Sequence, residues 1–307
     1  MRTRYACDVC IAIEALMVAT PADKNIALQR AEGEVRVSFK RRGEATVLDD
    51  LYQRGCAKAR FPRVDRDAPF EAVLINTAGG LTDGDRVSVD LSWGEGARAL
   101  VTTQAAERIY RSRGGHARLH QRLHVAPQAS AIWLPQESIV FDGGRFERRT
   151  EVVLAEGAAW LGGEVLVLGR TAMGERVATG AVRDHWRIRI GGKLIFADGL
   201  DIDSERHGNL QSYLDHAAIA GGAHVLATVL LVAPDAERYL SPVRDALESS
   251  GVASGASYVG ATMVMRLAAN DAPAIRRTMI ALFNVIKSVG GAQNPFAGFS
   301  MPRVYDC

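Results

Sequence analysis

The chain has 307 residues, of which 48% are hydrophobic and 23% charged, and its formal net charge is +2 at pH 7. This composition predicts a folded protein with a sizeable core and excludes an intrinsically disordered chain. The small net charge and the lack of a long basic run argue against a nucleic-acid partner. The short pairs Arg41-Arg42 and Arg148-Arg149 are interpreted as part of a solvated sheet face. No stretch of 18 apolar residues occurs, so we expect no transmembrane helix and no membrane partner.

Residues 1–30 are expected to form a flexible leader outside the fold, because convincing hydrophobic alternation begins only at Val35. Met17 is a possible start of translation. The leader contains the C-x-x-C pair Cys7 and Cys10, which can bind metal or cycle redox but is a weak signal without a second pair. The four cysteines are not arranged as a disulfide framework, which favours a reducing, cytoplasmic location.

From Val35 the apolar residues alternate as in β-strands. We expect short strands near residues 35–39, 45–48 and 72–77, with a loop over 55–62. Residues 78–85 are rich in glycine and aspartate, which predicts a tight hairpin. A phosphate cradle is less favoured there, because no Gly-Lys-Ser/Thr ending and no helix follow.

Residues 76–164 contain an internal repeat. When the sequence is aligned with itself at an offset of 32 residues, four positions match. The matching pairs are Leu91 with Leu123, Ala97 with Ala129, Ala99 with Ala131 and Gln104 with Gln136. At an offset of 29, a weaker third copy puts Val152 in the place of Leu123, Leu154 in that of Val125 and Ala158 in that of Ala129. Each copy contains two strands joined by a tight turn. Such a period predicts stacked units that bury their apolar faces against one another.

After the repeat, residues 185–198 predict a hairpin around Gly191-Gly192, and 198–222 is irregular and polar. The C-terminal part, 223–290, predicts a β-α-β-α unit with helices at 234–250 and after Asp271, a plausible N-cap ahead of Pro273. The second helix places Ile275, Met279, Leu282, Phe283 and Ile286 on one face. The chain is therefore expected to be mainly β, a stack of layered strands with two C-terminal helices on one side. We expect one domain over 31–305, comprising the β-stack 31–222 and the portion 223–290.

His116, His120 and His124 are spaced by four residues. In a helix they would form a metal-binding stripe, but in a strand residues four apart are about 13 Å apart, too far for one ion. We therefore interpret them as a polar sheet face. Acidic residues occupy turns and strand ends, and no Ser-His-Asp spacing, nucleophile elbow or His-Glu-x-x-His motif accompanies them. From the residues alone, no catalytic centre is recognisable.

Three long motifs occur in order: Asn76-Thr-Ala-Gly-Gly-Leu-Thr-Asp-Gly-Asp85, Thr102-Thr-Gln-Ala-Ala-Glu-Arg-Ile-Tyr-Arg-Ser112 and Trp133-Leu-Pro-Gln-Glu-Ser-Ile-Val-Phe-Asp142. With Leu166-Val-Leu-Gly-Arg170, Gly174-Glu175 and the terminal Pro302-Arg-Val-Tyr305, they resemble the signature blocks of the urease accessory protein UreD (UreH) family. The resemblance runs from about Val35 to Tyr305. The family more often has tryptophan where this chain has Tyr305, and the leader has no counterpart there.

The resemblance implies a β-helix-like fold and a maturation factor that is not an enzyme. Such a factor binds the urease apoprotein directly, recruits accessory protein F and, through it, the GTPase G, and guides two Ni²⁺ ions into urease through an internal polar tunnel. No tightly bound cofactor is implied, only transient Ni²⁺. Spaced carboxylates would bind nickel weakly enough to release it. The candidates for this path are Asp83, Asp85, Glu107, Glu137, Asp142, Glu164 and Glu175. Alternatively, each caps a turn or pairs with arginine.

A second hypothesis is a β-rich hydrolase that uses paired carboxylates such as Glu137 and Asp142. These two groups would have to face one cleft about 5–9 Å apart. Aromatic residues make up only 7% of the chain and form no stripe on which sugars could stack. A third hypothesis, a scaffold without metal contact, differs from the first only in whether nickel passes through.

Overall fold

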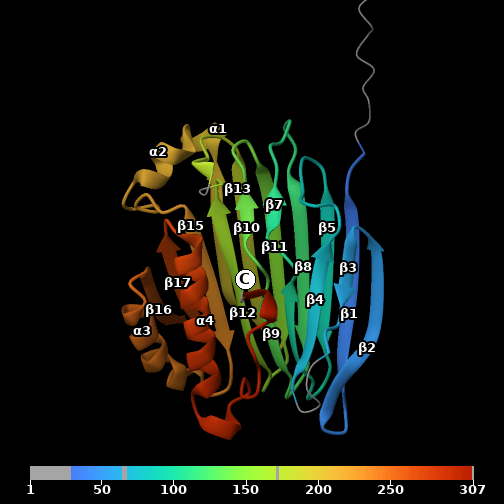
Figure 1. Ribbon diagram of the computed structural model, residues 1–307. Helices are drawn as coiled ribbons and strands as arrows, with labels where there is room; N and C mark the ends of the chain where they lie inside the picture. The colour runs from blue at the N-terminus through green and yellow to red at the C-terminus, as the bar shows by residue number, and fades with distance from the viewer. Residues whose placement is uncertain (1–28, 64–67, 171–172, 306–307) are drawn as a thin grey trace, which may run out of the picture.

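The computed structural model describes residues 29–63, 68–170 and 173–305. The strands form two sheets that pack against each other and run along the length of the molecule (Figure 1). The seven-stranded sheet has the order β14 (Lys193–Asp203), β13 (Ala181–Ile190), β11 (Arg145–Leu154), β8 (Ala117–Val125), β5 (Arg86–Trp93), β1 (Glu32–Arg42), β2 (Ala45–Gly55). The main path of the ten-stranded sheet is β16 (Ala253–Val259), β17 (Thr262–Ala269), β15 (Val225–Val232), β12 (Ala159–Leu168), β9 (Ser130–Leu134), β6 (Arg98–Thr103), β4 (Phe70–Asn76), β3 (Ala57–Arg60). Beside this path, β10 (Ser138–Val140) pairs with β12 and with β7 (Glu107–Ile109).

The repeat in the sequence is the coil of a β-solenoid. Each copy supplies one strand to each sheet: β5 and β6, then β8 and β9, then β11 and β12. In the parallel ladders, Leu123 lies between Leu91 and Val152, at the predicted offsets of 32 and 29. Ala99 pairs with Ala131 in the other sheet. The β-helix-like stack is therefore confirmed, and each offset is the number of residues in one coil.

The two long C-terminal helices are confirmed, α3 (Leu240–Ser249) and α4 (Ala272–Ser288). They cover the outer face of the ten-stranded sheet near β15 and β17 (Figure 1). The Asp271 side chain caps α4 by accepting from the amide of Ala274 at 3.1 Å, with Pro273 in the first turn. The five apolar residues predicted for one face of α4 are all buried. Three 3-10 turns flank these helices, at Ala236–Tyr239, Gly291–Gln293 and Arg303–Tyr305.

Four local expectations were wrong. Residues 78–85 do not form a hairpin, because β4 before them and β5 after them belong to different sheets. The expected loop 55–62 contains β3, because Ala57 and Ala59 alternate into the core while the strand pairs with β4. The segment 198–222 is not irregular throughout: β14 extends to Asp203, and two short helices follow, α1 (Ser204–His207) and α2 (Leu210–Asp215), capped by Asp203 and Asn209. The C-terminal unit has an additional strand, β16, between α3 and β17.

Two apolar clusters hold the layers together. One lies between the sheets and contains all four tryptophans, and the other lies between the ten-stranded sheet and the helices α3 and α4. Because β12 is covered on both faces, all ten of its residues are buried. Its pairing with β15 joins the C-terminal portion to the solenoid. The expected boundaries of a single domain over 31–305 stay a prediction.

Several features expected from the sequence concern residues outside the described ranges, namely most of the leader with Cys7, Cys10 and Met17, and Cys307. Within the described ranges, no helix has the length and apolar character needed to cross a membrane. The predicted strand is confirmed as β8 for His120 and His124, whereas His116 lies just before it. His120 and His124 lie on its outer side, since Gln121, Leu123 and Val125 are the buried residues.

Candidate functional site

Polar side chains lie inside the solenoid, on strand β11 of the seven-stranded sheet, between β13 and β8. On β11 the even-numbered residues Phe146, Arg148, Thr150, Val152 and Leu154 are buried, and the odd-numbered residues are partly or fully exposed. Arg148 is 2% exposed and Thr150 is 1% exposed. The Thr150 hydroxyl donates to Gln121 Oε1 of β8 at 2.6 Å. Since buried charges are costly unless paired, the partners of Arg148 determine what this interior can do.

Arg148 bridges the two sheets through its guanidinium group. Its Nε and Nη2 atoms donate to the two carboxylate oxygens of Asp184 on β13, at 3.0 and 2.5 Å. Asp184 is also its register partner in the parallel ladder. Its Nη1 atom donates to the Ser138 hydroxyl at 3.0 Å, and its Nε atom lies 2.6 Å from Glu164 Oε2. Burial lowers the pKa of Arg148, but Asp184 and Glu164 raise it by more, so this side chain is a permanent cation.

Glu164 projects from β12 of the opposite sheet and is 3% exposed. Its other oxygen, Oε1, accepts a long hydrogen bond of 3.5 Å from the Trp133 indole. Burial raises the pKa of Glu164 and the nearby Asp184 adds to this effect, while Arg148 acts in the opposite direction. Two carboxylates, Glu164 and Asp184, thus share one buried guanidinium. The cluster carries an excess acidic group that can hold a proton or face a second cation.

Two cavities meet at this cluster. The first has a volume of about 220 Å³ and extends toward β3, β4 and β7. The second has a volume of about 310 Å³ and extends toward β14, β16 and β17, with Glu164 and Asp184 in its wall. Arg148 lines both cavities. At the far side of the second, Arg266 of β17 forms an ion pair with Asp198 of β14 and donates to the Thr228 hydroxyl at 2.7 Å.

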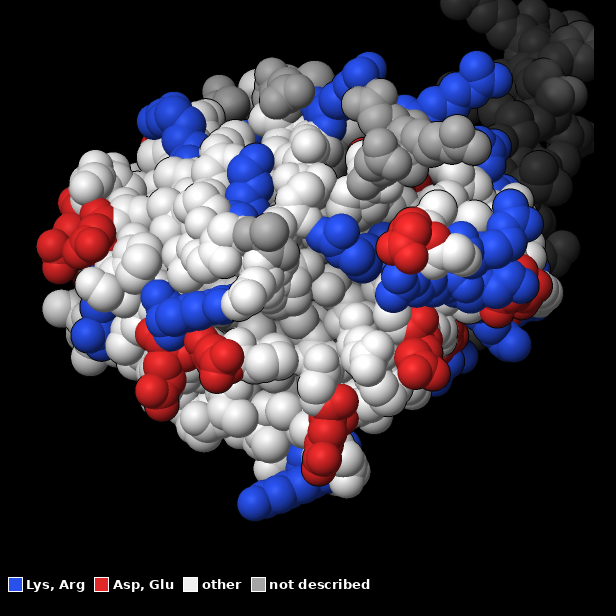
Figure 2. Space-filling view, turned by 90° about the horizontal axis from the view of Figure 1, so that it is seen from below, with Lys and Arg blue, Asp and Glu red and all other residues white. Residues whose placement is uncertain are grey.

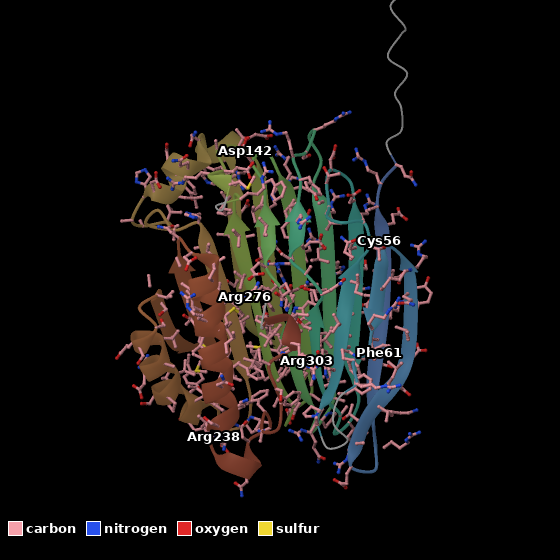
Figure 3. All side chains as sticks on the ribbon, viewed as in Figure 1. Cys56, Phe61, Asp142, Arg238, Arg276 and Arg303 are labelled. Atoms are coloured by element: carbon pink, nitrogen blue, oxygen red, sulfur yellow. The ribbon has the colours of Figure 1, made fainter. Side chains whose placement is uncertain are left out.

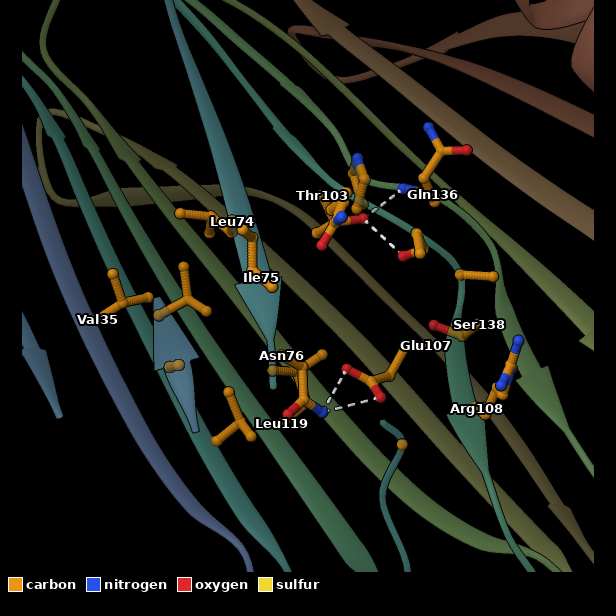
Figure 4. A pocket seen from close by; sticks show the side chains of 18 of the residues that line it. Val35, Leu74, Ile75, Asn76, Thr103, Glu107, Arg108, Leu119, Gln136 and Ser138 are labelled. Carbon is orange, nitrogen blue, oxygen red and sulfur yellow. Dashed lines mark hydrogen bonds between the residues drawn. The ribbon is translucent and has the colours of Figure 1, made fainter. Parts of the chain in front are cut away.

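The first cavity contains the carboxyl group of Glu107 at the start of β7 (Figure 4). Both of its oxygens accept from the Asn76 side-chain amide at 3.1 Å, which is an uncharged partner. Burial raises the pKa of Glu107 to about 7, although the hydrogen bonds from Asn76 and the Arg108 backbone act to lower it. Elsewhere in the lining of this cavity, the Thr103 hydroxyl accepts from the backbone amide of Gln136 at 2.8 Å (Figure 4). Near neutral pH, Glu107 can therefore exchange a proton for another cation.

The other carboxylates named from the sequence lie away from these cavities, in turns and loops. Asp85 accepts from the amides of Ala31 and Thr82, both at 2.8 Å, and so closes the turn before β5. Asp83 forms an ion pair with Arg30 at 3.3 Å. Glu175 accepts from Arg170, and this hydrogen bond, despite the opposing effect of burial, holds its pKa below the usual range.

Glu137 and Asp142, the pair of the hydrolase hypothesis, have separate partners. Glu137 accepts from Arg276 of α4 at 2.8 and 3.0 Å. Asp142 accepts from the amides of Ala178 and Thr179, both at 2.9 Å, and from Arg111 at 2.7 Å. Figure 3 shows Asp142 near the upper end of the solenoid and Arg276 near its middle. The arrangement does not favour the hydrolase, because each carboxylate is engaged in its own contacts.

The structure thus brings two of the seven candidates, Glu107 and Glu164, to the interior cavities. That any of the seven carries nickel stays a prediction. The sequence interpretation of Arg148 as part of a solvated face was wrong, since only Arg149 of that pair is exposed, and Asp184 was missed. The period-2 alternation counted back from Val152 points Arg148 inward, and the same count from Trp186 and Ile188 does so for Asp184. In the described part of the chain, no three His, Cys, Asp or Glu side chains converge in an arrangement that could hold a metal ion.

The lower end of the solenoid presents a surface of mixed character. Figure 2 shows a broad uncharged area, with Lys and Arg side chains interspersed with Asp and Glu rather than gathered in one patch. Charges of both signs are mixed on this face, in keeping with the small net charge of the whole chain, +2.

Comparison with known proteins gives the family. The sequence profile of the UreD urease accessory protein family matches residues 31–297. The chain is 41% identical over 267 residues to "Urease accessory protein UreD 1" of Brucella abortus, covering 87% of this chain and 94% of that protein. It is 43% identical over 278 residues to the UreD protein of Rhizobium leguminosarum bv. trifolii, covering 91% and 96%. The corresponding values for the protein of Sinorhizobium medicae are 41% over 284 residues, 91% and 97%. The chain therefore belongs to the UreD family of urease accessory proteins.

Proposed function

We propose that this protein is a nickel-insertion factor, not an enzyme, that binds apo-urease and guides Ni²⁺ between its two sheets to the urease active site. In this proposal accessory protein F docks directly on the chain, the GTPase G acts through F, and the assembly works in the cytoplasm. Family membership supports the role in urease maturation. The nickel path is supported by the pair of cavities that meet at Arg148.

The chemistry of the cavities suits a cation that must move on. Beside the cations Lys58, Arg108, Arg148 and Arg266, the cavities are lined by carboxylates, amides and hydroxyls. The carboxylates form separate stations, Glu107 with Asn76 in the first cavity and Glu164 with Asp184 in the second. Such oxygen donors bind Ni²⁺ more weakly than a site of imidazole or thiolate ligands does. A carboxyl with a pKa near 7, such as Glu107, releases a proton when the metal binds and takes one up when it leaves.

A cell-free activation assay tests the role of the protein. Apo-urease, proteins F and G, GTP, Ni²⁺ and bicarbonate are combined with and without this chain, and urease activity is followed over time. We expect activity to appear only when the chain is present. Equal activation without it, with every other component verified as competent, would contradict the proposal.

A pair of glutamate variants tests the path. Glu164→Gln removes the inner charge, and we expect activation to slow by about tenfold, as is common when a group next to a metal is changed. Glu151→Gln is the matched control, because Glu151 lies on the outer side of β11 with a side chain that is 49% exposed. Equal rates for the two folded variants would remove Glu164 from the path.

A further inference from the structure

The Arg148 guanidinium lies where the two cavities meet, and it occupies the carboxylates that a passing cation would use. Its side chain is 3% exposed and contacts Glu164 at 2.6 Å and Asp184 at 2.5 Å. A plain structural ion pair would satisfy one carboxylate with one guanidinium. Here one guanidinium contacts two acids from opposite sheets and lines two cavities of about 220 and 310 Å³.

A divalent cation and a guanidinium cannot occupy this junction together. Both bind carboxylate oxygens, and like charges in contact repel strongly in a poorly solvated interior. If the metal binds Glu164, Arg148 must move away from it. If Arg148 returns, the metal loses a ligand and gains a neighbouring positive charge.

We propose that Arg148 is a displaceable gate that competes with the metal ion for Glu164 and so prevents nickel from being retained inside the protein. The inference rests on the proposed function. In the resting state the guanidinium is paired with both Glu164 and Asp184. An incoming ion takes its place on Glu164, and the return of Arg148 releases the ion into the next cavity.

The surroundings allow such a movement. Asp184 anchors Arg148 within its own sheet through two hydrogen bonds, at 3.0 and 2.5 Å, whereas Glu164 belongs to the opposite sheet and its Oε2 atom lies 2.6 Å from Nε. The guanidinium can therefore leave Glu164 while it keeps its bond to the Asp184 oxygen that accepts from Nη2. Cavity volume is present on either side to receive it.

Removal of the competing charge tests the gate in the full chain. Arg148→Met keeps a long side chain without the charge. We expect this variant to bind one Ni²⁺ at least about tenfold more tightly than the unmodified chain, measured by equilibrium dialysis with NiSO₄ and metal analysis. In the activation assay with F and G, the nickel-loaded variant should transfer its metal about tenfold more slowly.

The matched control is Arg122→Met. Arg122 forms the same kind of two-point pair with Asp90, on the outer side of the adjacent strand β8, with one hydrogen bond of 2.8 Å. This variant should bind nickel and support activation as the unmodified chain does. Arg148→Met with unchanged nickel affinity, or with tight binding but an unchanged transfer rate, would overturn the gate.

Should Arg148→Met fail to fold, as judged by circular dichroism, Arg148→Lys replaces it. Lysine keeps the positive charge but lacks the planar fork that reaches both acids. We then expect about threefold more bound nickel at a fixed free Ni²⁺ concentration, and no increase would overturn the gate. Failure of the proposed function looks different, because the unmodified chain itself would then not stimulate urease activation.

Discussion

Substitution of Asp142 can distinguish a carboxylate that binds passing nickel from one that only stabilises the fold. Its Oδ1 atom accepts from the amides of Ala178 and Thr179 at 2.9 Å and from the Thr179 hydroxyl at 3.2 Å. Its Oδ2 atom pairs with Arg111 at 2.7 Å, whose side chain is 71% exposed. The carboxylate therefore joins the loop after β10 to the segment that leads into β13.

The cost of removing it can be worked out from these contacts. Asp142→Ala leaves the part-buried amide of Ala178 without an acceptor, while the more exposed Thr179 amide can turn to water. The lost acceptor costs about 1–2 kcal/mol at Ala178 and about 0.5–1 kcal/mol at Thr179, so we expect the free energy of unfolding to fall by about 1.5–3 kcal/mol. Asp142→Asn keeps an oxygen for these donors and loses only the exposed ion pair, so its cost should be within about 1 kcal/mol.

Urea denaturation at pH 7, with urease activation measured on the same folded samples, checks this prediction. Folded Asp142→Asn should support activation as the unmodified chain does. Burial raises the pKa of Asp142, but the Thr179 and Ala178 amides together lower it below the usual range, so its stabilising contribution is complete at neutral pH and is lost as the pH falls through the folded-state value. A fully stable Asp142→Ala variant that no longer supports activation would refute the reasoning and return the carboxylate to the nickel path.

Two further predictions concern the interior. Burial raises the pKa of Glu107 from 4.5 to about 7, so the folded state binds this proton more tightly than the unfolded state does. The free energy of unfolding of the unmodified chain therefore falls as the pH rises through this window. Glu107→Gln has no such loss, and urea titrations between about pH 4.5 and 8 should show it gaining at most about 3 kcal/mol relative to the unmodified chain. Glu175→Gln, at a carboxyl with a lowered pKa, should show no such gain, and a flat difference for Glu107→Gln would contradict the burial argument. Leu123→Ala, at a fully buried site in the central column of the coils, should cost about 3–5 kcal/mol by thermal or urea unfolding. Leu194→Ala, at a side chain 45% exposed, should stay within about 0.5 kcal/mol, and similar losses at both sites would mean that the column is not tightly packed.

The sequence by itself determined the coil. Period-2 alternation and the offsets of 32 and 29 are local signals, and the ladder that places Leu91, Leu123 and Val152 side by side follows from them directly. The amphipathic face of α4 and its Asp271 cap are also local, and both were predicted. The wrong expectations concern short elements such as β3 and α2, where a few residues carry too little pattern to outweigh their turn-like neighbours.

Only the tertiary structure decided which charges share the interior. The acidic residues look alike in the sequence. In the structure, Asp85 and Asp142 accept hydrogen bonds from backbone amides, whereas Glu107 and Glu164 line cavities. The Arg148 cluster joins strands of two sheets, with Glu164 supplied across the layer. The period of the strand determines the face of the sheet on which a side chain lies. Its partner in the opposite sheet depends on how the two sheets pack against each other. That packing is set by the whole core rather than by any local pattern.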